Sequence, residues 1–369
     1  MKVASSLLAT VATLLMTTSP SSTLASPISD AEVIRTAPDQ LVIEWKDPDP
    51  VDVLMADSPD TAAAAATLLS ARDGDGSHAV RVEGEVRPYF LLRDSRGGEV
   101  RRVAERVLPL EQGSNFRDVG GYAAADGKHV RWGLIYRSGG QPLLSDADVA
   151  RVKSLGIANL VDLRSNEERV LAPSRLDGIP YNAIGYSMAA LTGPPTDKPK
   201  DHDPALDPEA YAEAYANSYR AFPTLVAPHL RIIFGELLSK EQPILYNCSA
   251  GQDRTGFVTA VVLSALGVPR DTIYPDYLLS TPLRNPQWEL PPISDALAQS
   301  DPIAALFASA QKRPEYNTPN SLLTPTGEPF LTVAFEEIEK RWGSVDAYLK
   351  KEIGLSEADI AALRLRYLE

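Results

Sequence analysis

The chain has 369 residues, enough for two domains of ordinary size, and 44% apolar residues, enough to fill their cores. Its 36 basic and 49 acidic side chains leave a net charge of −13, which argues against nucleic acid as a partner, because duplex binding needs Lys and Arg on the phosphates. The single cysteine excludes an internal disulfide.

Residues 1–25 have the features of a secretion signal. Lys2 is the one charge ahead of an apolar stretch, and cleavage after Ala25 would leave Ser26 as the first residue. No later segment reaches ~18 consecutive apolar residues, the length of a membrane helix. We therefore expect an exported protein, periplasmic or secreted, with no transmembrane span in the mature chain. An uncleaved anchor or a disordered tail is the alternative.

Residues 28–108 contain short stretches of alternating apolar and polar residues, separated by Pro, Gly and Asp clusters. This pattern is typical of a small β-sandwich, and it resembles a fibronectin type III module. The predicted strands lie near residues 40–45, 51–54, 79–82, 89–92 and 100–107. Residues 109–113 form the predicted junction to a second domain.

From residue 109 to residue 369, predicted strands alternate with predicted helices. This order indicates an α/β domain with a central, mostly parallel sheet flanked by helices. Residues 243–246 predict a buried strand, and residues 257–266 predict a buried helix that ends at Gly267. Near the end of the chain, residues 328–342 predict an amphipathic helix, and Ser356 is placed to cap a last one.

The nine residues 248–256, which lie between that strand and that helix, carry the chemistry of the sequence. A tight loop that leads into a helix N-terminus can turn its backbone N–H groups toward one point, where they bind a tetrahedral anion. Cys248 at the base of the loop lies in the same field, which favours the nucleophilic thiolate. The expected anion-binding residues are Ser249, Ala250, Gly251, Gln252 and Gly256.

Two further side chains of the loop have expected roles. Arg254, separated from Cys248 by five residues, offers a planar fork to two oxygens of a phosphoryl group. The hydroxyl of Thr255 is placed to bind the sulfur and stabilise it as a leaving group. The alternative is an inert, buried cysteine ahead of a helix that carries an arginine by chance.

The loop resembles that of the bacterial tyrosine-phosphatase-like family, whose Cys-x5-Arg motif reads HCxAGKDRTG. Further blocks agree in order: N-F-R-D-V-G-G-Y at residues 115–122, G-L-I-Y-R-S at 133–138 and V-D-L-R-S at 161–165. The resemblance covers residues 109–369. It implies a phosphatase that works through a phosphocysteine intermediate without a metal or organic cofactor, on a phosphorylated protein, lipid or small molecule. Arg117 and Asp118 are expected to lie near the loop and support it; the alternative is that they only fix the entry turn of the domain.

Two residues depart from the family pattern. Asn247 stands where the family has His, so no imidazole supports the thiolate. Gln252 replaces a Lys that is linked to polyanionic lipid headgroups. We therefore expect phosphotyrosine or small aryl phosphates as substrates in preference to phosphoinositides, which remain the alternative.

The general acid has two candidates. A carboxylic acid must lie within hydrogen-bond reach of the leaving oxygen. Asp253 lies in the loop itself, and the resemblance implies that it can face the substrate. Asp162 ends a predicted parallel strand at the edge that faces a ligand crevice. The alternative for Asp162 is a structural ion pair with Arg164 or Arg117.

Other readings of the sequence remain open. A phosphate-binding pseudophosphatase is argued against by the intact loop, and arsenate reduction by the lack of further thiols. The four histidines form no ligand-spaced cluster, so we expect no metal site. Tyr211, Tyr215 and Tyr219 recur on one helix face, which indicates either core packing or an aromatic wall over the cleft.

Overall fold

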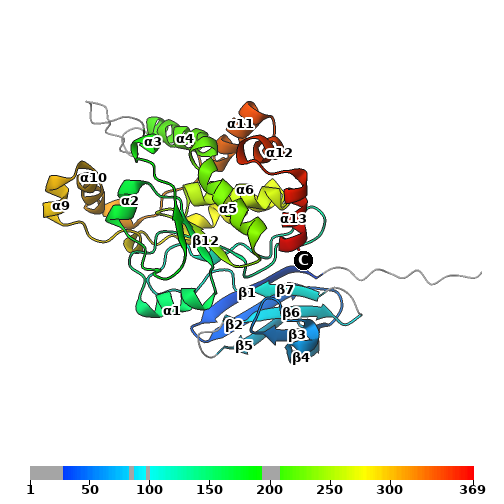
Figure 1. Ribbon diagram of the computed structural model, residues 1–369. Coiled ribbons are helices and arrows are strands. Elements are labelled where there is room, and N and C mark those ends of the chain that lie inside the picture. The colour runs from blue at the N-terminus through cyan, green and yellow to red at the C-terminus, as the bar shows by residue number, and fades with distance from the viewer. Residues whose placement is uncertain (1–27, 83–86, 97–99, 193–207) are drawn as a thin grey trace, which may run out of the picture.

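A computed structural model describes residues 28–82, 87–96, 100–192 and 208–369. The predicted secretion signal lies outside these described residues. Figure 1 shows an N-terminal module of strands packed against one side of a larger α/β domain, with the C-terminus at the boundary between them.

The N-terminal module (residues 28–104) contains two antiparallel sheets, with strand orders β1-β2-β5 and β4-β3-β6-β7. Alternating residues of their strands point into one shared core, as expected for strands with one buried face. Leu41 and Ile43 from the first sheet meet Phe90 and Leu92 from the second. The strands are β1 (Ser29–Ala37), β2 (Gln40–Lys46), β3 (Val51–Ala56), β4 (Thr67–Asp73), β5 (Ser77–Arg81), β6 (Tyr89–Asp94) and β7 (Val100–Ala104).

The α/β domain is built on a five-stranded sheet of order β11-β10-β12-β9-β8. The first four strands run parallel, and β8 pairs antiparallel to β9, which confirms the mostly parallel sheet. The strands are β8 (Arg117–Asp118), β9 (Ile135–Ser138), β10 (Asn159–Asp162), β11 (Tyr181–Ala183) and β12 (Ile244–Asn247).

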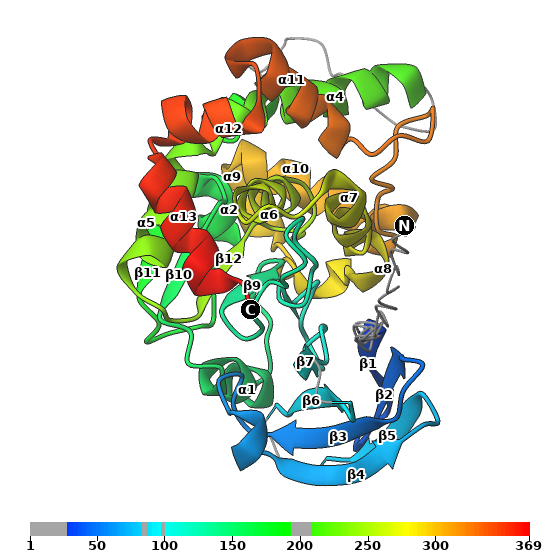
Figure 2. The same cartoon turned by 90° about the vertical axis from the view of Figure 1, so that its right-hand side faces the viewer.

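Helices cover both faces of this sheet. Neighbouring residues of one strand point to opposite faces, so Leu245 joins the core under α1, while Ile244 and Tyr246 join the larger core under α4, α5, α6 and α11. Figure 2 shows α6 inside the domain, with α4 and α11 above it. The helices on the two faces are α1 (Asp146–Ser154), α2 (Asn166–Leu171), α4 (Pro208–Leu225), α5 (Ala227–Ser239), α6 (Asp253–Ala265), α11 (Leu331–Trp342), α12 (Val345–Tyr348) and α13 (Glu357–Tyr367).

Shorter helices complete the connections, and the predicted C-terminal helices are present. α11 ends at Gly343, and Ser356 forms a capping box with Asp359 at the start of α13. The remaining helices are α3 (Ala189–Thr192), α7 (Arg270–Leu278), α8 (Ser280–Leu283), α9 (Asp295–Ser300) and α10 (Pro302–Gln311). Within the described ranges no single helix has the length and apolar content of a membrane span, although α4 and α5, bent by 50°, have them jointly.

The register of the sheet brings three strand ends together. Asp162, Asn247 and Ser138 are the last residues of β10, β12 and β9, and they are direct partners across the sheet. The loops that follow these strands therefore meet at one edge, where α/β sheets bind their ligands. The predicted nucleophile loop is the central one of the three.

Candidate active site

The phosphate loop (residues 248–254) connects β12 to α6 and has Cys248 at its base, 1% exposed. Three of its carbonyl groups accept hydrogen bonds from residues outside the loop. Gly140 donates to the Ser249 carbonyl at 2.7 Å, and the Asn115 amide donates to the carbonyls of Ala250 and Gly251 at 3.1 and 2.8 Å. Because the N–H and C=O of a peptide point in opposite directions, the following N–H groups turn toward the centre of the loop, as an anion-binding nest requires.

Two glycines make this path possible. Gly251 has a φ of +67°, and a Cβ there would lie 2.6 Å from the backbone N of Gly139. At Gly256, in the first turn of α6, a Cβ would lie 2.7 Å from the ring of Tyr277. Each position needs a residue without a side chain, for conformation in the first case and for close packing in the second.

Arg254 is held by a residue that the sequence analysis did not identify. Its Nη1 and Nη2 donate to the two carboxylate oxygens of Glu168, each at 2.7 Å, and Nη1 also donates to the Tyr186 hydroxyl at 2.7 Å. Burial opposes the charge of Glu168, but the nearby charge of Arg254 and the hydrogen bonds to this carboxylate lower its pKa to about 2. The paired fork is thus fixed in place before a substrate arrives.

A local signal in the sequence marks Glu168. Ser165 and Glu168 form a capping box at the start of α2, the Ser-x-x-Glu pattern. The same carboxylate accepts from the Ser249 hydroxyl at 2.7 Å. Glu168 therefore ties three elements together: the α2 N-terminus, the phosphate loop and Arg254.

Asp162 is in the structural ion pair that the sequence left open as an alternative. Its carboxylate accepts from Nε and Nη2 of Arg164, at 2.6 Å for the shortest contact, and from the Tyr181 hydroxyl at 2.8 Å. The side chain of Asp162 is fully buried. It pairs with Arg164 and not with Arg117, which favours the ion pair over the general acid of the two interpretations.

Arg117 contacts residues that hold the phosphate loop. It donates to the Asp276 carboxylate at 3.1 Å and to the side-chain oxygen of Asn115, whose amide holds the loop carbonyls. Arg137 donates to the other oxygen of Asp276 at 2.6 Å and to the Gly251 carbonyl at 2.8 Å. Burial opposes the charge of Asp276, but the two guanidinium groups hold the pKa of its carboxyl well below the usual range.

Asp253 is anchored by the tyrosines of α4. The hydroxyls of Tyr215 and Tyr219 both donate to its Oδ1, the second at 2.6 Å, and the Tyr219 hydroxyl also meets that of Tyr277 at 2.5 Å. Tyr211 stacks on Tyr215 at 5.7 Å between ring centroids. The sequence left two interpretations of this tyrosine face, core packing and an aromatic wall over the cleft. Tyr219 is fully buried, which agrees with core packing. Its hydroxyl also contacts the candidate acid.

Two other predicted residues make contacts that the sequence did not suggest, and a third lacks the contact that was expected. The side chain of Gln252 is buried, and its carbonyl oxygen accepts a hydrogen bond from Arg284 at 2.8 Å. The amide of Asn247 donates to the Cys248 carbonyl at 3.1 Å. The Thr255 hydroxyl has no hydrogen-bond partner among the described residues, so the expected bond to the Cys248 sulfur is not formed here.

The described part of the chain contains no group of three or more His, Cys, Asp or Glu side chains arranged to hold a metal ion. The charged groups around the loop are instead paired with one another. The exception is the inner face of the loop, where backbone N–H groups turn toward Cys248. Glu168 holds Nη1 and Nη2 of Arg254, so the donors of Arg254 left for a substrate are its Nε–H and the second N–H of Nη2, which have no hydrogen-bond partner among the described residues. This arrangement can bind a phosphoryl group and bring it onto a sulfur nucleophile.

The comparisons with known proteins agree with this chemistry. The tyrosine phosphatase family matches residues 108–369. A protein of Cupriavidus necator named for tyrosine-protein phosphatase activity is 33% identical over 268 residues, 71% of this chain and 88% of that protein. The triple specificity protein phosphatase PtpB of Mycobacterium tuberculosis is 30% identical over 289 residues, 71% of this chain and 98% of that protein. With its loop and its relatives in agreement, this chain belongs to the tyrosine phosphatase family and is a phosphoric monoester hydrolase.

Proposed function

We propose that the enzyme hydrolyses phosphotyrosine or small aryl phosphates through a phosphocysteine intermediate on Cys248. The observation that carries the proposal is the two-point pairing of Arg254 with Glu168 beside a loop whose carbonyls are bonded outward. Both features prepare hydrogen-bond donors for phosphoryl oxygens before binding, and prepared donors stabilise the charge that develops in the transition state.

In the first step the Cys248 sulfur attacks phosphorus, and the bond from phosphorus to the ester oxygen breaks. The leaving oxygen takes a proton from Asp253, whose Oδ1 is occupied by two tyrosine hydroxyls, so the proton is carried on Oδ2. In the second step water attacks the phosphocysteine and gives a proton to the Asp253 carboxylate, which restores the acid used in the first step. The sulfur leaves as a thiolate and inorganic phosphate is released.

The preference for aryl phosphates over phosphoinositides rests on Gln252. A lysine at this position would add a cation beside the phosphate. Gln252 adds none, and its side chain is engaged with Arg284, whose own charge is paired with Glu289 at 2.9 Å. The test compares turnover of a phosphotyrosyl peptide with that of a phosphoinositide in mixed micelles. A strong preference for the lipid would overturn this part of the proposal.

The decisive experiment on mechanism is hydrolysis of p-nitrophenyl phosphate by the wild type and by Cys248→Ser, with and without a chelator. We expect the variant to lose activity by roughly 10³-fold or more, as enzymes do when the nucleophile is removed, and the chelator to have no effect. Rapid acid quench with a radiolabelled substrate is expected to trap phosphate on the wild type and none on the variant. Full activity of Cys248→Ser would remove the mechanism.

We further propose that the enzyme is exported and that residues 28–108 form a fibronectin type III-like sandwich ahead of the catalytic domain at 109–369. Lys2, the apolar stretch and Ala25 support export, and the two antiparallel sheets with one shared core support the sandwich. Expression of the full chain in a bacterial host, fractionation and N-terminal sequencing test export. A chain that stays in the cytosol with its first residues intact would contradict it.

A further inference from the structure

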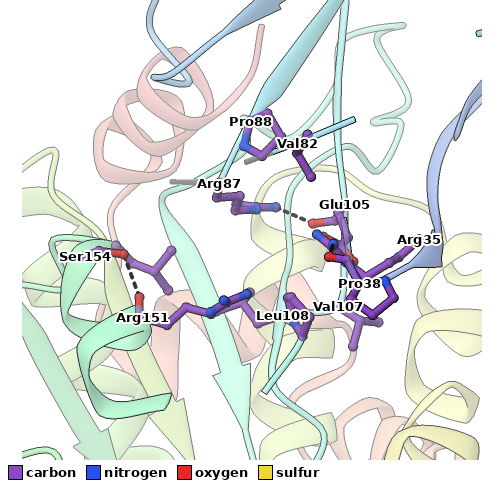
Figure 3. A pocket seen from close by; sticks show the side chains of 12 residues that line it. Arg35, Pro38, Val82, Arg87, Pro88, Glu105, Val107, Leu108, Arg151 and Ser154 are labelled. Carbon is purple, nitrogen blue, oxygen red and sulfur yellow. Dashed lines mark hydrogen bonds and ion pairs between the residues drawn. The ribbon is translucent and has the colours of Figure 1, made fainter. Parts of the chain in front are cut away.

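One arginine of the N-terminal module reaches into the α/β domain. Arg87 lies just before β6, and its Nη1 donates to the Asp118 carboxylate at 2.6 Å. Its Nη2 donates to the Glu105 carbonyl at 2.6 Å. Figure 3 shows Arg87 at the wall of a pocket between the two parts of the molecule, extended toward Glu105.

Asp118 depends on this arginine for its charge balance. The carboxylate is fully buried. Its other hydrogen bonds come from the backbone N–H groups of Gly120 and Gly133, both at 2.7 Å, and neither donor carries a charge. Among the described residues, Arg87 is the cation paired with this carboxylate, while Arg106 donates to the Asp118 backbone carbonyl. A buried carboxylate that loses such an ion-pair partner is left with the cost of its desolvation.

The environment of Arg87 is suited to a permanent cation. Burial opposes its charge, but Asp118 and the phenol oxygens of Tyr136 and Tyr89 raise its pKa above the ordinary value. The guanidinium also lies 5.0 Å from the centre of the Tyr89 ring and 5.8 Å from that of Trp132. These contacts join aromatic residues of both parts around one charge.

Asp118 is separated from the phosphate loop by three short steps. It is the second residue of β8, directly after Arg117. Arg117 bonds the side chain of Asn115, and the Asn115 amide holds the carbonyls of Ala250 and Gly251. Asn115 has a φ of +57°, a conformation that an isolated chain seldom adopts, so its position relies on its neighbours.

The family match begins at residue 108, so Arg87 comes from outside the part of the chain that the family shares. The relatives from Cupriavidus and Mycobacterium are matched over 88% and 98% of their lengths by 71% of this chain. In this protein, the N-terminal module therefore adds an ion pair between Arg87 and Asp118. Asp118 itself belongs to the region that the family shares.

We propose that Arg87 is a positioning residue for catalysis: through Asp118 and β8, the N-terminal module fixes the strand from which Asn115 and Arg117 hold the phosphate loop. The N-terminal module then contributes to the geometry of the active site without contacting the substrate. This inference rests on the proposed function only in taking the loop as the phosphate site.

The test uses the full chain with Arg87→Met and, as the conservative variant, Arg87→Lys. The control is Arg93→Met, which breaks an ion pair with Asp52 inside the module. Each protein is assayed with p-nitrophenyl phosphate at a temperature where circular dichroism shows it fully folded. Inhibition by inorganic phosphate and by vanadate is measured alongside, because these anions report the loop's geometry without turnover.

We expect Arg87→Met to lower kcat roughly ten- to a hundred-fold and to weaken vanadate inhibition, since small displacements of a catalytic loop have effects of this size. Arg87→Lys is expected to recover part of both losses, and Arg93→Met to match the wild type. In an Asp118→Asn background, Arg87→Met is expected to add less than about two-fold, because the pair is already broken.

Folded Arg87→Met with kcat and vanadate inhibition within two-fold of the wild type would overturn the proposal. Equal losses in Arg93→Met would overturn it as well, since the effect would then come from the module in general. If instead Cys248→Ser retained activity, the phosphocysteine mechanism would fail, while the anion measurements on Arg87→Met would still decide the positioning role.

Discussion

The guanidinium of Arg254 donates to both carboxylate oxygens of Glu168, at 2.7 Å each. A bidentate pair of this kind fixes the plane of the fork as well as its position. Without Glu168, the long side chain of Arg254 would pay a larger entropy cost each time it met a phosphoryl group. The pair also explains how the charged side chain of Arg254 can be buried beside the anion site, because Glu168 neutralises its charge.

Replacement of Glu168 by Gln is expected to lower kcat/KM for p-nitrophenyl phosphate by roughly ten- to a hundred-fold. Gln retains the size of the side chain but removes the charge and one of the two acceptors for Arg254. The matched control is Glu167→Gln, on the neighbouring residue, which bonds Ser187 and Met188 and does not contact Arg254. Steady-state kinetics on both variants make the comparison. Equal activity of the two would show that the pair with Arg254 is dispensable.

Stability at mildly acidic pH is expected to depend on His229. This residue of α5 is fully buried against the ring of Tyr186, and burial lowers its pKa from 6.5 to about 4. Between these values the unfolded chain binds a proton that the folded protein does not, so the contribution is complete above pH 6.5 and is lost as the pH falls toward 4. From pH 7 to pH 5 we expect a loss of about 2 kcal/mol from this group.

Urea unfolding of the wild type and of His229→Phe at the two pH values measures this term. Phe preserves the ring against Tyr186 but cannot be protonated, so we expect the variant to lose about 2 kcal/mol less than the wild type between pH 7 and pH 5. The same pH dependence in both proteins would mean that His229 titrates alike in the folded and unfolded states.

The features that could be predicted from the sequence are those that short-range patterns determine. The strand, the turn with Gly251 and the helix after it are adjacent in the chain, so spacing alone locates Cys248 and Arg254. The partners that fix them are distant: Glu168 is 86 residues from Arg254, and Arg87 is 31 residues from Asp118 across a domain boundary. Such pairs form only when the sheet register brings their strands and loops together. The capping box at Ser165 was the one local clue to Glu168.

The assignment of Asp162 illustrates the same limit. Its place at the carboxyl end of β10 was predicted. The position of a residue in a strand, however, does not determine which partner its carboxylate binds. Arg164, two residues on, folds back and occupies both of its oxygens. Asp253 could be recognised from the loop motif, whereas its tyrosine donors on α4 became visible only when helix and loop were packed together.

The double variant Tyr215→Phe/Tyr219→Phe is expected to impair proton donation by Asp253. With both hydroxyls removed, Oδ1 loses its donors, and the proton is no longer directed to Oδ2. A good leaving group needs little protonation, so turnover of phenyl phosphate is expected to fall several-fold more than turnover of p-nitrophenyl phosphate. Asp253→Asn is expected to show the same selectivity more strongly.

Tyr211→Phe is the control for this prediction. Tyr211 stacks on Tyr215, but its hydroxyl makes no hydrogen bond to Asp253 within the described structure. We expect both substrates to be turned over as by the wild type. If the double variant slowed the two substrates equally, Asp253 would be an anchor for α4 and the proton would come from another group.

Hydrogen peroxide is expected to inactivate the enzyme, and a thiol reductant to restore it. A Cys248 thiolate attacks peroxide to give the sulfenic acid, with water as the other product, and the sequence has no second cysteine to trap this species as an internal disulfide. Early addition of dithiothreitol is therefore expected to recover activity, while prolonged exposure carries the sulfur to the irreversible sulfinic acid. Inorganic phosphate in the loop is expected to slow the loss, because it occupies the approach to the sulfur. Mass spectrometry of the peptide containing Cys248, taken at matched times, tests the argument: full inactivation with this cysteine unmodified would show that another residue is the target, and resistance to peroxide would count against a thiolate beneath the loop.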